Sequence, residues 1–463
     1  MHDSAASRVS ARSSPAHLDI CALTLMALVL NLVTLGTRSI VFDESTSANF
    51  ARFGFIPLLH VIGGGDPNMG LYYLLLNFWV RLFGDSEAAV RSLSAIFGAL
   101  AVSAIYLLGT RLFGRMVGII AGVLLALDAF IVEYAQTARS YSMLVFLVIL
   151  SSYFLVVELE QPSKRTRIKY VLTSTLAIYA HYFAVYLLVV HLVTVVAMRR
   201  YAALTREWMG MTAAILLLCI PAVITAHLGG GTIWIRWIER PSLNDFGTAL
   251  VDLAGGSRLL LILLLAGGCY ATLCAIRERR YWPIGFIAAW LILPVVFSFA
   301  ASMVSPMFLS RYLIICVPAL ILFGAAGLAR VRSPIVAAAL AAPIVWLTAT
   351  HLAAYYGRAG SENWRDATHY VLAATRPDDG MVFYPDYAHK PFDYYQRRSE
   401  VAGPTNLAGQ EPVERNRIWL VIRKSDAGVH ILDVLHLRSS LTERYRLVDR
   451  HGFRGVGIEL YAK

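Results

Sequence analysis

The apolar run LDICALTLMALVLNLVTLG (residues 18–36) is followed by SIVFDESTSANFARFGF (39–55), whose two acids, Asp43 and Glu44, are adjacent. Similar apolar runs recur as far as residue 352, and a run of about 20 apolar residues is long enough to cross a bilayer as a helix. Of the 463 residues, 57% are hydrophobic and 15% are charged, whereas a soluble domain has about a quarter charged residues. The chain is therefore predicted to be an α-helical polytopic membrane protein.

Eleven membrane spans are predicted, at residues 18–36, 88–109, 116–132, 139–157, 169–181, 183–198, 209–226, 248–275, 282–301, 311–329 and 334–352. Lys and Arg gather in alternate connections, on the same side as the N-terminal tail (1–17). They are Arg111 and Arg115; Lys164, Arg165, Arg167 and Lys169; Arg199, Arg200 and Arg206; Arg277, Arg279 and Arg280; Arg330 and Arg332. Short loops rich in Lys and Arg stay in the cytoplasm, so the first outer loop (37–87) and residues 353–463 are predicted to be extracytoplasmic. This distribution explains much of the net charge of +11, and no nucleic-acid partner is predicted.

The segment MGLYYLLLNFWVRLF (69–83) is predicted to be a helix at the membrane surface, because counting it as a span would place the basic connections outside. Residues 353–463 differ in character from the rest. There, GMVFYP and RIWLVIR predict strands, SENWRDATHYVLAAT and GVHILDVLHLRSSL predict helices, and YRLVDRHGFRGVGIELYAK predicts a hairpin. Strands that alternate with helices indicate a small α/β domain.

Polar side chains gather at the predicted outer ends of the spans. They are Asp43 and Glu44; Glu133, Tyr134, Gln136, Arg139 and Tyr141 in VEYAQTARSYS; His181 and Tyr182; Arg236, Trp237, Glu239 and Arg240 in WIRWIERP; and Arg311 and Tyr312 in MFLSRYL. Ionisable groups at membrane depth are unfavourable, so a set of them raises the odds of a functional site.

Each of these residues also has a structural interpretation. Arg139 and Arg311 could reach lipid headgroups, and a histidine such as His181 is more often a satisfied hydrogen-bond partner between helices. Asp43 could cap the helix that follows it, a role that is compatible with catalysis. For Glu44, in the first helical turn, the structural interpretation is favoured.

The functional interpretation joins these groups in one reaction. A carboxylate that faces water can accept a proton from an attacking hydroxyl, and arginines bind phosphate through charge-assisted hydrogen bonds. The set therefore predicts a lipid-linked phosphate donor that meets a hydroxyl acceptor, and no nucleotide-binding motif competes with it. The alternatives are a transporter or flippase of lipid-linked saccharides, whose polar residues usually lie near the bilayer midplane, and a structural or sensory protein that displays the C-terminal domain.

Several motifs, in order along the chain, favour the enzyme. FDE, LYYLLL before LFGDSEAAVRSLSA, RLFG, YAQTARSYS and SRYL together resemble the integral-membrane GT-C glycosyltransferases. The most similar branch is the bacterial family-39-like one, related to protein O-mannosyltransferases and to the aminoarabinose transferases of lipid A. The resemblance covers about residues 18–352. It implies a GT-C fold in the bacterial plasma (inner) membrane, and inverting sugar transfer from a polyprenyl-phosphate donor to a glycan, lipid or protein acceptor at the outer face.

The resemblance also assigns roles by position. Asp43 matches the first-loop carboxylate and is expected to be the general base, with Glu44 beside it as a second catalytic candidate. Arg139 and Arg311 match the arginines expected to bind the donor phosphate. The residues expected to line the cavity are Asp66, Tyr72, Glu133, Tyr141, His181 and Tyr312.

The sequence departs from the family pattern in two places. DPNMGLYY (66–73) has Asn68 where relatives often have His or Lys, and QTAR has Thr137 where many relatives have Glu. Asp66 and Glu133 could compensate for these changes in part. No cofactor is assigned on this basis, and a divalent metal is left open.

Overall fold

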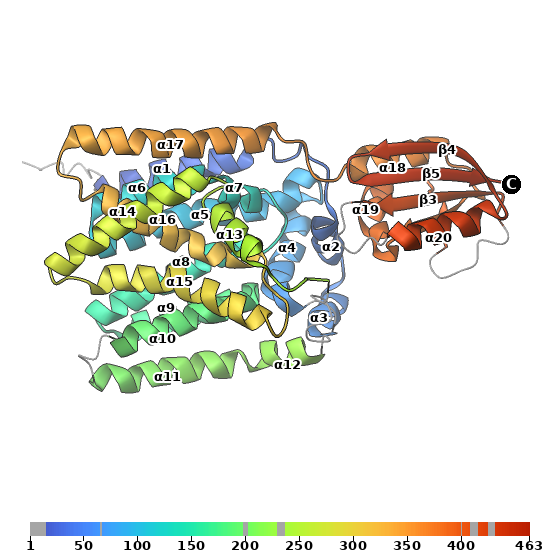
Figure 1. The fold of residues 1–463 in the computed structure, drawn as a ribbon. Coiled ribbons are helices and arrows are strands. Elements are labelled where there is room, and N and C mark those ends of the chain that lie inside the picture. Colours follow the sequence, from blue (N-terminus) through green and yellow to red (C-terminus); the bar gives the residue numbers. More distant parts are fainter. Residues whose placement is uncertain are drawn as a thin grey trace, which may run out of the picture.

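The computed structural model describes residues 15–64, 67–197, 202–228, 237–399, 401–407, 415–424 and 431–463. Figure 1 shows a bundle of helices and, at one end of it, a small domain with a β-sheet formed by the last part of the chain. The helices before this domain are α1 (Pro15–Leu32), α2 (Phe42–Phe50), α3 (Phe55–Gly64), η1 (Pro67–Met69), α4 (Gly70–Phe83), α5 (Glu87–Phe113), α6 (Arg115–Leu127), α7 (Ala129–Ala135), α8 (Tyr141–Glu160), α9 (Lys164–Ala180), η2 (Tyr182–Ala184), α10 (Val185–Ala197), α11 (Ala202–Leu218), α12 (Ile220–Leu228), α13 (Leu243–Asp252), α14 (Arg258–Arg277), α15 (Trp282–Ser302), η4 (Ser310–Cys316), α16 (Val317–Leu328) and α17 (Pro334–Gly357).

Each predicted span coincides with a helix or a pair of helices, although fewer than eleven meet the length of a bilayer. Among the described residues, 6 helices are long and apolar enough to cross a membrane, or up to 8 if the bent pairs α6–α7 (63°) and α11–α12 (40°) each count as one span. The other three predicted spans correspond to α1, α9 and α10, which are shorter. The prediction of an α-helical integral membrane protein is confirmed, with fewer full-length spans.

The predicted span 248–275 is wrong at its start, because a turn separates α13 from α14. Gly255 and Gly256 adopt φ angles of +63° and +86° in this turn, a conformation that glycine tolerates because it lacks a Cβ. Ser257 then caps α14 by accepting the backbone N–H of Leu260 at 3.2 Å. The apolar run therefore contains two helices, of which α14 alone has the length of a span.

The helices of the bundle differ in how deeply they are buried. The apolar parts of α5, α8 and the η4–α16 helix are 67%, 72% and 94% buried, whereas those of α14 and α17 are 28% and 22% buried. The first three therefore form the centre of the bundle, and α14 and α17 present apolar side chains to the lipid.

Helices α14 and α16 touch at glycine. A Cβ added to Gly327 would lie 1.9 Å from the carbonyl oxygen of Gly267, so the two backbones approach as closely as only small residues allow.

We expect Gly327→Ala to lower the free energy of unfolding by about 1–3 kcal/mol, because the helices must move apart, as measured by thermal unfolding in detergent. Gly285→Ala in α15 is the control, since its Cβ would meet no described atom within 4 Å. Equal stability of the two variants would contradict the expectation.

The C-terminal domain contains a mixed five-stranded sheet of order β2-β1-β3-β5-β4. Its strands are β1 (Gly380–Tyr384), β2 (Thr405–Asn406), β3 (Arg417–Arg423), β4 (Arg446–Phe453) and β5 (Val456–Ala462), and its helices are α18 (Trp364–Ala374), α19 (His389–Ser399) and α20 (Ile431–Thr442), with the short η5 (Asp386–Ala388). Strands β4 and β5 form the predicted closing hairpin. The boundary predicted at residue 353 falls inside α17, which continues to Gly357.

The side chains of strand β3 pack into two different apolar clusters, one on each face of the sheet. Successive side chains of a strand face opposite sides, and here Trp419 and Val421 join the core that continues into the membrane domain. Ile418 and Leu420 pack instead in a second cluster, with residues of α20 such as Val434. The strand is therefore buried on both faces, as its continuous apolar run indicates.

The C-terminal domain also contacts the first outer loop directly. The hydroxyl of Tyr395 in α19 accepts the backbone N–H of Ile40 at 2.7 Å. Arg365 in α18 pairs with Glu87, at the start of α5, at 2.8 Å. These contacts hold the domain to the segment before α2 and to the start of α5, and α19 also packs against α2, where the two predicted acids lie (Figure 1).

Candidate active site at the first outer helix

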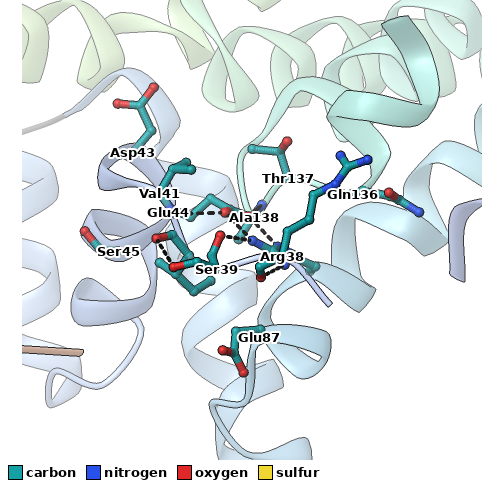
Figure 2. A network of polar contacts seen from close by, with 12 residues as sticks. Arg38, Ser39, Val41, Asp43, Glu44, Ser45, Glu87, Gln136, Thr137 and Ala138 are labelled. Carbon is teal, nitrogen blue, oxygen red and sulfur yellow. Dashed lines mark hydrogen bonds and ion pairs between the residues drawn. The ribbon is translucent and has the colours of Figure 1, made fainter. Parts of the chain in front are cut away.

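Asp43 and Glu44 are neighbours in α2, but their side chains point in different directions (Figure 2). Glu44 is buried, and Arg91 of α5 binds both of its oxygens, with Nε 2.7 Å from Oε1 and Nη2 2.6 Å from Oε2. The backbone N–H groups of Ala138 and Val41 donate to the same carboxylate at 2.9 Å and 3.3 Å. Glu44 therefore ties α2 to α5 and to the loop before α8.

The other donors of Arg91 hold the chain that leads into α2. Nη1 donates to the carbonyl oxygens of Leu35 and Arg38, both at 2.9 Å, and Nη2 donates to that of Ser39 at 3.0 Å. A buried guanidinium is stable only when its donors are satisfied in this way. Arg91 is not among the residues predicted from the sequence, where its one signal is a charge inside the second turn of a predicted span.

Asp43 faces the helix η4, where Arg311 lies. Its Oδ2 accepts a hydrogen bond from Nη1 of Arg311 at 3.1 Å, and the side chains are 38% and 25% exposed, so water reaches this pair. Burial raises the pKa of the Asp43 carboxyl, but the positive charges of Arg139, Arg311 and Arg423 outweigh it, and the net pKa is lowered. Asp43 is therefore a carboxylate at neutral pH.

Arg311 is held largely by aromatic rings. Its guanidinium carbon lies 5.6 Å from the ring centre of Trp237 and 5.5 Å from that of Tyr312, an arrangement in which the rings attract the positive charge. Its Nε atom is buried and has no hydrogen-bond partner among the described residues. The group is thus suited to bind an anion with more than one oxygen.

Arg139 is positioned by a short relay of hydroxyl groups. Tyr72 lies 2.8 Å from Ser94, whose hydroxyl donates to the backbone carbonyl of Arg139 at 3.0 Å. Nη1 of Arg139 also donates to the hydroxyl of Tyr73 at 3.3 Å. Tyr72, which was expected to line the cavity, is 0% exposed and reaches the backbone of Arg139 through Ser94.

His181, Tyr141 and Tyr312 form an aromatic cluster next to the arginines. The ring centre of His181 lies 5.6 Å from that of Tyr141 and 5.3 Å from that of Tyr312. The histidine is buried, with Nε2 3.2 Å from the side-chain amide of Asn68 and Nδ1 accepting the backbone N–H of Phe183 at 3.3 Å. These contacts agree with the structural interpretation of His181 as a satisfied hydrogen-bond partner.

No described hydrogen bond or ion pair joins Glu133 to Asp43. Glu133 is exposed, and the positive charges acting on it are those of Arg38 and Arg358. Asp66, which was expected to line the cavity, and Arg236, which was predicted to lie at the outer end of a span, are outside the described residues. Within the part of the chain that the structure describes, no group of three or more His, Cys, Asp or Glu could hold a metal ion.

The architecture is that of the GT-C glycosyltransferases, and the predicted fold class is confirmed. Crystal structures of ArnT from Cupriavidus metallidurans, in the apo state and bound to undecaprenyl phosphate, match with TM-scores of 0.64 at 15% and 14% identity, and cover 96% and 95% of this chain and 98% and 97% of ArnT. The oligosaccharyltransferase of Archaeoglobus fulgidus in the apo form matches with a TM-score of 0.60 at 14% identity, over 88% of this chain and 65% of that chain.

A sequence-family match agrees with the fold. The family described as dolichyl-phosphate-mannose-protein mannosyltransferase matches residues 68–225, from η1 into α12. This stretch includes the loop that carries Arg139. No curated protein matches the chain. The resemblance to GT-C enzymes that the motifs indicate is confirmed by both comparisons.

Proposed function

We propose that the chain transfers a sugar from a polyprenyl-phosphate-linked donor to an acceptor hydroxyl at the outer face of a bacterial plasma membrane, with inversion and with Asp43 as the general base. The observation that carries the proposal is a water-accessible carboxylate grouped with the guanidinium groups of Arg311 and Arg139 beside the apolar bundle. The similar folds support the donor class. ArnT has been solved with undecaprenyl phosphate, and the Archaeoglobus fulgidus oligosaccharyltransferase with dolichol-phosphate.

In this mechanism the donor phosphate takes the place of Asp43 on Arg311. Arg139 and Arg311 then neutralise the phosphate, and Asp43 is free to accept the proton of the acceptor hydroxyl. The acceptor oxygen bonds to the anomeric carbon as the bond from that carbon to the phosphate oxygen breaks, and polyprenyl phosphate leaves with the electron pair. The two guanidinium groups stabilise the charge that develops on the leaving group, and attack from the opposite face inverts the anomeric carbon.

Glu44 has a positioning role in this proposal, in line with the structural interpretation favoured for it from the sequence, and is not given the role of a second catalytic group. Both of its oxygens already accept hydrogen bonds from Arg91, and one of them also accepts the backbone N–H of Ala138. A carboxylate that is buried and fully paired is not available to a substrate proton. Its contacts instead hold α2 in place, and Asp43 is the next residue along the helix.

Release of polyprenyl phosphate tests the proposal, because it is the common product whatever the sugar or acceptor. The purified full-length chain is incubated with a panel of undecaprenyl-phosphate-linked sugars and a cell-envelope fraction, and both products are followed by mass spectrometry. Release coupled to glycosylation of a glycan, lipid or protein acceptor is the expected result. Movement of labelled donor across liposomes without any release would overturn the proposal in favour of a flippase.

Arg311→Lys is expected to lower the transfer rate about 100-fold and to weaken binding of undecaprenyl phosphate about tenfold. A lysine keeps the charge, but it cannot donate two parallel hydrogen bonds to a phosphate. Rates come from the release assay and affinities from titration with undecaprenyl phosphate. Arg330→Lys is the control, since Arg330 lies beyond the other end of α16 and pairs with Glu278 at 3.6 Å. Equal rates for the two variants would exclude Arg311 from the donor site.

A further inference from the structure

A buried carboxylate, Glu362, joins the C-terminal domain to the start of α2. Its Oε2 accepts the backbone N–H of Phe42 at 3.1 Å and the indole N–H of Trp364 at 2.6 Å. Its Oε1 accepts a hydrogen bond from Nε of Arg423 in β3 at 2.8 Å, and the Glu362 side chain is 2% exposed. A carboxylate buried this deeply is stable only when it is well paired, and here the donors come from both domains.

The residue that Glu362 holds is the one before Asp43. The first N–H groups of a helix have no partner within it, and a negative group at that end is favoured by the helix dipole. The C-terminal domain also surrounds the Phe42 ring, with the guanidinium carbon of Arg423 4.6 Å from its centre. The ammonium of Lys390 lies 5.4 Å from the same centre, and the ring of Tyr387 lies 5.1 Å away.

Arg423 also acts on Asp43 through its charge. The charges that act most strongly on Asp43 are those of Arg139 and Arg311 of the membrane domain and of Arg423 of the C-terminal domain, and the Asp43 charge in turn acts on the phenols of Tyr134 and Tyr141. Because Arg423 is only 14% exposed, water screens its charge less than that of a surface arginine. It is thus one of the three cations that lower the pKa of Asp43.

We propose that the C-terminal domain is part of the catalytic apparatus, with Glu362 and Arg423 as positioning residues that fix the start of α2 and hold Asp43 in its working place. The inference rests on the proposed function, in which Asp43 is the base. It gives the appended domain a direct role in the transfer step, since Glu362 acts on the active site from the segment before α18 and Arg423 acts on it from β3.

Arg423→Gln is expected to lower kcat about tenfold, because Asp43 is no longer held in the reactive geometry. It is also expected to move the acid limb of the kcat/KM pH profile to higher pH. Loss of the cation lets the pKa of Asp43 rise, and the base then becomes protonated at a higher pH than in the wild type. Arg423→Lys keeps the charge, so the acid limb is expected to stay in place while kcat recovers in part. Binding of undecaprenyl phosphate is expected to be unchanged in both variants.

The matched control is Arg417→Gln, at the other end of the same strand. Arg417 is 12% exposed and pairs at 3.5 Å with Asp379, a carboxylate that is 2% exposed and that also accepts an indole N–H, from Trp419 at 2.9 Å. The pair is built like that of Arg423 but contacts no described residue of α2. Wild-type kcat and pH profile are expected for Arg417→Gln.

The outcomes separate this inference from the proposed function. If Asp43→Asn keeps wild-type transfer, the part of the proposed function that makes Asp43 the base fails. If Asp43→Asn is inactive while Arg423→Gln matches Arg417→Gln in kcat and pH profile, only the inference is overturned. If Arg423→Gln loses binding of undecaprenyl phosphate, the test passes to Arg423→Lys. A reduced kcat of Arg423→Lys, with the acid limb of its pH profile as in the wild type, supports the inference. A wild-type kcat of Arg423→Lys overturns it.

Discussion

Asp43→Asn is expected to lower the rate of undecaprenyl phosphate release about 10³-fold, while the protein stays folded and still binds undecaprenyl phosphate. The amide has nearly the shape of the carboxylate, and its oxygen can still accept the hydrogen bond from Arg311, but it cannot take up the proton of an acceptor hydroxyl. General base catalysis is worth roughly 10²–10⁴ in rate. The measurement is single-turnover release, with binding of undecaprenyl phosphate followed in parallel.

Asp393→Asn is the control for this substitution. Asp393 in α19 is 39% exposed, against 38% for Asp43, and it also has a basic partner, His389 at 2.7 Å. It should keep wild-type transfer, since it lies outside the group of residues around Arg311. An Asp43→Asn variant that binds donor and keeps more than about a tenth of wild-type turnover is incompatible with a general base at this position.

Arg91→Ala is expected to lower the free energy of unfolding by about 3–5 kcal/mol, the largest effect on stability proposed for this chain. The substitution leaves the Glu44 charge buried without its cation. It also removes the donors of the carbonyl groups at Leu35, Arg38 and Ser39, which hold the chain before α2. Thermal unfolding in detergent, calibrated with chemical denaturant, measures the loss.

Two further variants separate a buried pair from an exposed one. Arg111→Ala removes an ion pair with Glu160 whose side chains are 31% and 35% exposed, and a change within about 1 kcal/mol is expected. Combining Arg91→Ala with Glu44→Gln should restore part of the stability, because the unpaired charge is gone. If Arg91→Ala and Arg111→Ala unfold at the same temperature, Glu44 and Arg91 do not form the anchor described here.

Hydropathy predicted the spans but not the direction of the helices. The run 116–132 becomes α6 and α7 with a bend of 63° between them, because the Asp128 side chain caps α7 by accepting the backbone N–H of Ile131 at 3.0 Å. The mean hydropathy over a window of residues carries no information about such a cap. In the C-terminal domain the apolar runs of β1 and β3 were identified correctly, whereas α19 was missed because its sequence, HKPFDYYQRRS, is largely polar.

The residues of the candidate site also fall into those that could be predicted from the sequence and those that could not. Asp43, Arg139 and Arg311 could be selected from their residue types and their places at the ends of predicted spans. Arg91 and Arg423 could not, because a single arginine in an apolar helix or strand carries no information about the carboxylate with which it pairs. Asp43 and Arg311 are 268 residues apart in the chain and 3.1 Å apart in space.

The amino-acid sequence by itself determined that this protein lies in a membrane, that its long apolar segments are helical, and which acids and arginines are candidates for chemistry. These properties follow from the transfer of side chains between water and lipid, which is close to a sum over residues. The tertiary structure alone decided that Glu44 pairs with Arg91, that Asp43 lies beside Arg311, and that β3 reaches the start of α2. Hydrogen bonds and ion pairs depend on distances of about 3 Å and on angles, and only the packing of elements distant in the chain sets these.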